Sequence, residues 1–168
     1  MRVAKMYVRL ATEQDIPCIM PIFSYARSYM ADSGNANQWI DGYPSRQKIL
    51  ADIGRGDFYV IEEKECGIVG CFCFYIGEDP SYAVIEKGEW LNDKPYGVVH
   101  RLASNGKVKG IAACCFDWCF SHCRNIRIDT HRDNKTLQHI LSKYGFLYCG
   151  IIHVENGTER LAFQKEIK

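Results

Sequence analysis

The stretch that decides the fold is YGVVHRLASNGKVKGIAACCFDWCFSHC, residues 96–123. Its first part, residues 97–103, is apolar enough to predict a strand, and residues 104–106 (Ser-Asn-Gly) predict a tight turn. Beyond the turn, apolar residues recur at the spacing of one helix face: Val108, Ile111, Ala112, Cys115, Cys119 and Phe120. The stretch therefore predicts a strand, a turn and a helix in immediate succession.

The start of this predicted helix has the features of a phosphate-binding turn. Backbone N–H groups at a helix N-terminus lack intrahelical partners and carry about half a positive charge. Lys107 and Lys109 add two cationic side chains there, and Gly110 has no side chain to keep an anion from the backbone. The alternative is a pair of solvated lysines, but lysine is more typical of a helix C-terminus. We therefore expect an anion site at this turn.

Composition describes an ordinary globular chain. Its 168 residues fit one domain, residues 1–168, with 47% apolar and 24% charged residues. A net charge of +1 gives no general electrostatic reason to bind nucleic acid or a membrane surface. The sequence has no run of about 18 apolar residues, and MRVAKMYVRL at its start lacks the apolar core of a secretory signal. We expect a cytoplasmic protein with no nucleic-acid or membrane partner, either a monomer or a homodimer.

The nine cysteines predict buried thiols rather than disulfides. Their number is odd, and several lie within apolar runs. Cys71 and Cys73 alternate along a predicted strand, while Cys115, Cys119 and Cys123 follow one helix stripe. Three thiols on a stripe could bind zinc, but no CxxC pair and no fourth ligand accompanies them, so we expect no metal. A thiol-dependent activity of this stripe is a weaker alternative.

The rest of the chain predicts alternating strands and helices. Further helices are expected at 16–32, 46–53 and 134–144, where capping residues precede apolar residues at helical spacing. Strands are expected at 6–10, 57–63, 67–76, 82–85, 97–103, 125–131, 146–154 and 160–165. Asn156-Gly157, between the last two strands, is a strong hairpin signal. This order predicts an α/β domain built on a mostly antiparallel sheet.

Two motifs give the chain a resemblance to a known family. Residues 107–112, KVKGIA, are similar to the phosphate turn Gln/Arg-x-x-Gly-x-Gly/Ala, with lysine in place of the usual first residue. Asn134, Lys143, Gly145 and Phe146 match the later motif Asn-x-x-Ala-x-x-hydrophobic-Tyr-x-Lys-x-Gly-Phe. Along nearly its full length the chain resembles the GNAT superfamily of acyl-CoA-dependent N-acetyltransferases. The resemblance implies a GNAT-like fold, a mostly antiparallel twisted sheet of about seven strands flanked by about four helices.

The resemblance also implies acetyl-CoA as the cofactor, bound at the turn. The strands at 97–103 and 125–131 would part at one end and free backbone groups for the pantetheine arm, as an added strand would. Amides of the turn would hold the pyrophosphate, Asn134 would hydrogen-bond the cofactor, and Lys143 would lie near its phosphates. The cofactor-binding residues that this implies are Arg101, Leu102, Ala103, Lys107, Val108, Lys109, Gly110, Ile111, Ala112, Asn134 and Lys143.

Acetylation of an amine needs a base, and His100 is the first candidate. It shares a strand face with Leu102, and imidazole titrates near neutral pH. Alternatively His100 packs in the sheet with both nitrogens satisfied, and the other candidates are Glu86, Glu89, Asp129 and His131. Leu141 occupies the position of the family's tyrosine acid, so no acid is assigned. Tyr148, His139 or water could protonate the thiolate, or no acid is needed.

The acceptor site is the least defined part of the sequence. Trp39 and Tyr43 lie between the first two predicted helices, a position that borders the acceptor pocket in such folds, and we also assign Glu86 and Trp90 to this site. An aromatic pocket could bind an apolar side chain or a cationic amine, although each tryptophan could instead pack a loop onto the core. We predict transfer of an acetyl group directly to a primary amine of a small molecule or peptide. The alternative, favoured by Leu141, is a catalytically weak or inactive acyl-CoA-binding module.

Overall fold

The computed structural model describes residues 5–168, in which there are seven strands and four α-helices. The strands are β1 (Met6–Leu10), β2 (Phe58–Glu63), β3 (Gly67–Ile76), β4 (Gly97–Ser104), β5 (Asn125–Thr130), β6 (Leu147–His153) and β7 (Glu159–Glu166). The helices are α1 (Ile16–Asp32), α2 (Arg46–Gly54), α3 (Ile111–His122) and α4 (Lys135–Tyr144), with 3₁₀ turns η1 (Glu13–Asp15) and η2 (Pro80–Tyr82). The α/β class expected from the sequence is confirmed.

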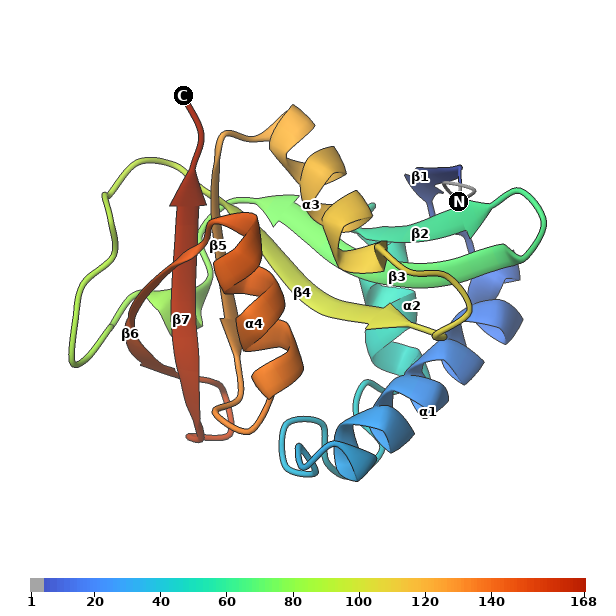
Figure 1. Cartoon of the computed structure of the whole chain (residues 1–168), viewed down its shortest axis with the longest axis horizontal. Helices are drawn as coiled ribbons and strands as arrows, with labels where there is room; N and C mark the ends of the chain where they lie inside the picture. The colour runs from blue at the N-terminus through green and yellow to red at the C-terminus, as the bar shows by residue number, and fades with distance from the viewer. Residues whose placement is uncertain (1–4) are drawn as a thin grey trace.

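The strands form one sheet in the order β1-β2-β3-β4-β5-β7-β6. Neighbouring strands are antiparallel except for β4 and β5, which are parallel. Helices α3 and α4 cover one face of the sheet, and α1 and α2 lie on the other (Figure 1). With helices on both faces, the middle of β3 is buried throughout, which explains its continuous apolar run GIVGCFCFYI.

The two faces of the sheet carry separate cores. On the α1–α2 face, Ile19, Phe23 and Ile49 pack with the inward side chains of β2 and β3. On the α3–α4 face, Phe116 and Leu141 pack against β3, β5 and β7. The expectation of buried thiols holds for five cysteines: Cys71, Cys73, Cys115 and Cys119 belong to these cores, and Cys149 is buried elsewhere. Cys18 and Cys66 are exposed, and all nine thiols are free.

The parallel pair β4–β5 is the feature that positions the site. The two strands pair only at Gly97 with Ile126 and at Val98 with Arg127, although β4 runs on to Ser104. The strands therefore separate toward their C-terminal ends, and the parting implied by the family resemblance is confirmed. On its other side β4 stays paired with β3, with a register shift at Arg101, whose φ is 53°.

Local sequence signals set the helix ends beside this parting. Gly110 precedes α3 with a φ of 87°, a left-handed conformation that favours glycine. Asn134 caps α4, because its side-chain oxygen accepts a hydrogen bond from the Leu137 N–H at 3.0 Å. Gly145 ends α4 with a φ of 109°, as expected from the sequence.

Two local predictions are wrong. The expected strand at residues 82–85 is absent: Asp79 and Pro80 begin a 3₁₀ turn in which the Tyr82 N–H bonds to the Asp79 carbonyl at 2.9 Å. Only Glu86 pairs with the sheet, as a single bridge to Ile151. Val108, expected on the helix face, lies in the turn instead, because α3 begins only after Gly110.

Within residues 5–168 no helix is long and apolar enough to cross a membrane. Over the same residues, no three His, Cys, Asp or Glu side chains are grouped closely enough to hold a metal ion.

Candidate functional site

A cleft of about 2180 Å³ opens where β4 and β5 part. Its lining includes Gly110 and Ile140 from the α3–α4 face and His100 and Arg160 from the α1–α2 face. The cleft therefore reaches from one face of the sheet to the other. We call its two parts the glycine-turn end, around residues 104–112, and the polar end, around His100.

The glycine-turn end presents backbone N–H groups. The first hydrogen bond of α3 runs from Cys114 N–H to the Gly110 carbonyl at 3.0 Å, so the amides of residues 111–113 precede the intrahelical ladder. No side chain caps the helix at Gly110, and a Cβ built there would have its nearest neighbour, Met6 Cε, at 3.8 Å. This turn has the space and the donors to hold an anion.

The two lysines of the turn are placed less directly than expected. Val108, Gly110, Ile111 and Ala112 line the cleft, whereas Lys107 and Lys109 are exposed side chains outside its lining. The Lys107 N–H donates to Asn105 Oδ1 at 3.1 Å, which closes the turn. Any contribution of these lysines to anion binding comes from the solvent side of the turn.

Helix α4 forms the wall opposite the turn. Leu137, Ile140 and Tyr144 face the cleft one above the other, with Lys143 at its rim. Asn134 also lines the cleft, but its oxygen caps α4 and its amide nitrogen donates to Gln38 at 3.0 Å. The wall is therefore apolar along its length and polar at its N-terminus.

Between the two ends, β4 offers an unpaired backbone edge. Arg101, Leu102 and Ala103 line the cleft beyond the last pairing with β5. Ala103 remains opposite Cys71 of β3, so only the edge that faces β5 is open. An extended ligand can pair with such an edge in the manner of an added strand.

At the polar end, His100 is held by Asp79. The distance from His100 Nε2 to Asp79 Oδ2 is 2.6 Å, and both side chains line the cleft. Asp79 also accepts hydrogen bonds from Tyr75 Oη at 3.2 Å and from the Ser81 N–H at 2.8 Å. His100 is therefore an oriented side chain at the cleft surface and not a core residue.

The charge state of Asp79 fixes which nitrogen of His100 is basic. Burial would raise the pKa of Asp79, but the hydrogen bond and charge of His100 and the bonds from Ser81 and Tyr75 outweigh it and leave that pKa lowered. An ionised carboxylate can only accept, so Nε2 carries the proton. The free electron pair of the neutral ring is therefore on Nδ1.

A second buried ion pair supports the same end. The Arg101 guanidinium binds Asp52 through Nε at 2.8 Å and Nη2 at 2.7 Å, and Asp52 is fully buried. Arg101 Nη1 also donates to Tyr43 Oη at 3.0 Å, and Tyr43 contacts Trp39 with ring centroids 6.3 Å apart. Both aromatic side chains line the cleft, as expected, on the loop 33–45 between α1 and α2.

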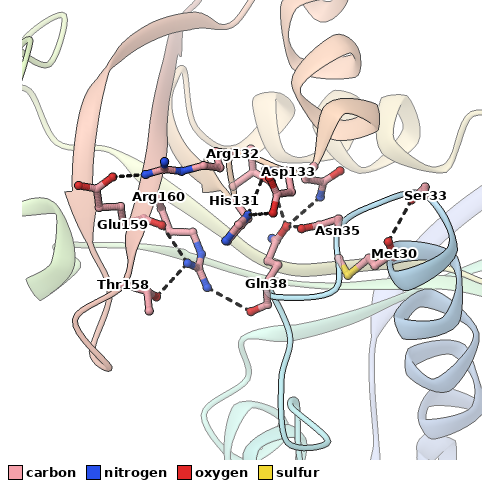
Figure 2. A network of polar contacts seen from close by, with 12 residues as sticks. Met30, Ser33, Asn35, Gln38, His131, Arg132, Asp133, Thr158, Glu159 and Arg160 are labelled. Atoms are coloured by element: carbon pink, nitrogen blue, oxygen red, sulfur yellow. Dashed lines mark hydrogen bonds and ion pairs between the residues drawn. The ribbon is translucent and has the colours of Figure 1, made fainter.

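The same loop is bonded across the cleft through Gln38. Its side-chain oxygen accepts from Asn35, Thr130 and Asn134, and its backbone carbonyl accepts from Arg160 Nη2 at 3.1 Å. Figure 2 shows Arg160 reaching from β7 toward this loop. Asp129 of β5 also lines the cleft and accepts a hydrogen bond of 2.6 Å from Tyr82 Oη.

Several other candidates lie outside the cleft lining. Trp90 packs against the Tyr82 ring, and its Nε1 donates a hydrogen bond to the Tyr82 carbonyl at 3.0 Å. Arg127 Cζ lies 4.2 Å from the centroid of the Trp90 ring. These contacts are those of a residue that holds a loop onto the core. Leu141 is fully buried in the core on the α3–α4 face. The remaining residues outside the lining are Glu86, Glu89, His131, His139 and Tyr148.

Solved structures resemble the whole chain. A crystal structure of a GNAT-family acetyltransferase from Streptococcus agalactiae is 33% identical, with a TM-score of 0.87 over 97% of this chain and 96% of that one. The chain belongs to the GNAT family of acetyltransferases. A GNAT-family acetyltransferase from Listeria monocytogenes is 21% identical, with a TM-score of 0.70 over 96% and 95% of the two chains. The NatC complex bound to Gag peptide and CoA shares the fold at 11% identity, a TM-score of 0.57 and coverages of 98% and 99%. No protein-family model and no curated protein matches the sequence.

In this GNAT-family chain, the two motifs of the resemblance lie on opposite sides of the parting. The KVKGIA turn precedes α3, and the helix that runs from Asn134 to Gly145 is α4. Three residues of the polar end carry no motif that marks them as site residues: Asp79, Asp52 and Arg160. Asp79 precedes a proline, a local pattern that indicates a turn but not a functional side chain.

Proposed function

We propose that this GNAT-family chain is an acetyl-CoA-dependent N-acetyltransferase that transfers an acetyl group directly to a primary amine of a small molecule or peptide. The observation that carries the proposal is the His100–Asp79 pair, 2.6 Å apart, in a cleft that continues between the parted strands to the glycine turn. A base and an anion site are thus parts of one cavity.

The residues fit coenzyme A as the cofactor. The open edge of β4 at Arg101, Leu102 and Ala103 suits an extended pantetheine arm, and the space at Gly110 suits a pyrophosphate. The distantly similar NatC complex was solved with CoA, which supports this assignment. We assign pyrophosphate binding to the amides from Val108 to Ala112, aided by the exposed Lys107, Lys109 and Lys143, with Asn134 at the α4 lip.

His100 is the base of the proposed reaction. Acetyl-CoA, when bound, supplies the acetyl group as a thioester. His100 Nδ1 takes a proton from the attacking amine, while the C–N bond forms and the C–S bond breaks. Asp79 holds the ring and stabilises the imidazolium that results. A backbone N–H of β4 beside Leu102 is the proposed donor to the carbonyl oxygen as negative charge develops there.

No side chain is assigned as the acid. Leu141, at the family's tyrosine position, is buried in the core. Tyr144 faces the cleft, but its Oη donates to Asp117 at 2.6 Å, and burial together with Asp117 raises its pKa. A thiolate is a stable enough leaving group to depart without a proton donor.

The test is thiol release from acetyl-CoA with a panel of primary amines and peptides, with the acetylated product identified by mass. We expect release that depends on the amine, with one acetyl group added per thiol freed. Tight coenzyme A binding without turnover across the panel would instead identify an inactive acyl-CoA-binding module. The cytoplasmic location and the monomer or homodimer state stay predictions from the sequence.

A further inference from the structure

Within residues 5–168, Arg127 and Arg160 are buried and the side chain of Arg101 is 7% exposed, and the three differ in what balances their charge. Arg101 is paired with the carboxylate of Asp52. Arg127 lies between the rings of Trp90 and Tyr96, with its Cζ 4.2 and 4.0 Å from their centroids. Arg160 is 6% exposed and lines the cleft. Within residues 5–168 it forms no ion pair with any carboxylate.

The partners of Arg160 leave part of its guanidinium available. Nη1 donates to Thr158 Oγ1 and to the Glu159 carbonyl, both at 2.9 Å, and Nη2 donates to the Gln38 carbonyl at 3.1 Å. All three acceptors are neutral oxygens (Figure 2). A guanidinium has five N–H groups, so one N–H on Nη2 and that on Nε remain. Arginine uses this kind of edge to bind carboxylates in a fork.

The surroundings of Arg160 are cationic as well as anionic. Burial lowers the pKa of Arg160, although the charge of Asp129 opposes this. Burial, Arg160 and Arg132 together lower the pKa of His131, while Asp133 raises it. A buried cation without a bonded anion is costly, and a carboxylate entering the cleft would relieve that cost.

We propose that Arg160 binds a carboxylate of the acceptor, so that the acceptor is an amino carboxylic acid. The inference rests on the proposed function, because it assigns the acceptor of the same cleft. The carboxylates of Asp79 and Asp129 lie at the same end of the cleft and favour an ammonium group there. The polar end thus carries both signs of charge that a zwitterion requires.

The experiment compares acceptors that differ only in the carboxylate. Phenylalanine is paired with 2-phenylethylamine, methionine with 3-methylthiopropylamine, and 4-aminobutyrate with propylamine. We expect the wild-type protein to acetylate the acid of at least one pair about 10- to 100-fold more efficiently, as kcat/KM, than its partner amine. Arg160→Gln should remove that preference, because kcat/KM should fall much more for the acid than for its partner amine.

A purely structural role for Arg160, as support for loop 33–45, predicts a different result. Arg160→Gln would then reduce turnover of both members of a pair by the same factor. Thr158→Val is the matched control, because it removes one neutral partner of the guanidinium and leaves the charge. Arg160→Lys keeps the charge without the fork and should retain a reduced preference. Coenzyme A affinity serves as the check of folding for each variant.

The outcomes separate the inference from the proposed function. Thiol release with amines but no preference for the acid in any pair overturns the inference and leaves the function intact. Absence of thiol release with every amine overturns the function. In that case, calorimetric titration of the same pairs into coenzyme A-loaded wild-type protein decides the inference, and equal or absent binding of acid and amine overturns it.

Discussion

At the glycine-turn end of the cleft, one continuous segment from Val108 to Ala112 supplies the backbone donors. At the polar end, His100, Asp79, Arg101 and Arg160 come from β4, the segment before η2 and β7. The first end depends on local chain geometry, and the second depends on how distant segments meet. The difference teaches that a short motif can indicate an anion site, whereas a group of side chains such as the polar end is defined only by the folded chain.

The largest expected effect is at Gly110. Gly110→Asp places a negative charge where the diphosphate is proposed to bind, and like charges about 4 Å apart repel by about 4 kcal/mol, roughly a thousandfold in Kd. Calorimetry with coenzyme A measures the loss. Gly110→Asn has the same shape without the charge and tolerates the left-handed backbone, so its loss of affinity should be clearly smaller. If Gly110→Asp and the wild type bind coenzyme A with equal affinity, the cofactor does not bind at the glycine turn, and the two ends of the cleft do not share one ligand.

His100→Ala tests the polar end alone. We expect kcat to fall about 100-fold or more, with coenzyme A affinity unchanged, because the proposed base is lost and the glycine turn is intact. The pH–rate profiles of the wild type and the variant should differ, because only the wild type has this base. His139→Ala, at an exposed position on α4 outside the cleft, is the control. An unaltered pH–rate profile in His100→Ala would remove His100 from the mechanism.

Asp79→Asn should have a smaller effect, about 10- to 100-fold in kcat, because the asparagine still reaches His100 but no longer fixes the proton on Nε2 or stabilises the imidazolium. A residue that acts only on folding would lower activity through a loss of folded protein, which urea unfolding would detect. Coenzyme A affinity should match that of the wild type.

Asp15 lies outside both ends and should affect stability alone. The hydrogen bond from Arg9, aided by the Thr12 N–H and opposed by burial, lowers the pKa of Asp15 from its ordinary 3.8. The resulting stability is present above that value and is lost as pH falls through the lowered pKa. Asp15→Asn should cost about 1 kcal/mol at neutral pH, a modest value because Arg9 is partly exposed, and progressively less as the pH falls through the lowered pKa of Asp15. Urea unfolding measures this, and Glu13→Gln is the exposed control.

The sequence predicted best the features that depend on neighbouring residues. Asn134 and Gly145 mark the ends of α4, and the apolar run of β3 matches its burial on both faces. The strand at residues 82–85 was wrong because Asp79 and Pro80 impose a turn that apolar alternation does not reveal. The elements and their order thus follow from local propensity, except where a turn overrides it.

The candidate site was predictable only in part. The glycine turn and His100 carry local signals, but the partner of His100 lies 21 residues away along the chain. Nothing in the spacing of these residues indicates that η2 brings Asp79 to β4. The sequence around Arg160 predicts an ordinary strand residue. Its burial could not be predicted, because it depends on the contact of loop 33–45 with β7 through Gln38. Contacts of this kind depend on tertiary packing and cannot be read from periodicity.

The two residue pairs that join β4 to β5 make the sheet two blocks with a narrow seam, β1 to β4 on one side and β5 to β7 on the other. In the proposed complex, a pantetheine arm lying along that seam would act as an extra strand that joins the two blocks. Bound cofactor would then stabilise the folded chain, so the loaded protein should melt at a higher temperature and more sharply than the empty one. While it is bound, the acetyl-CoA substrate would therefore also be a structural element of the sheet.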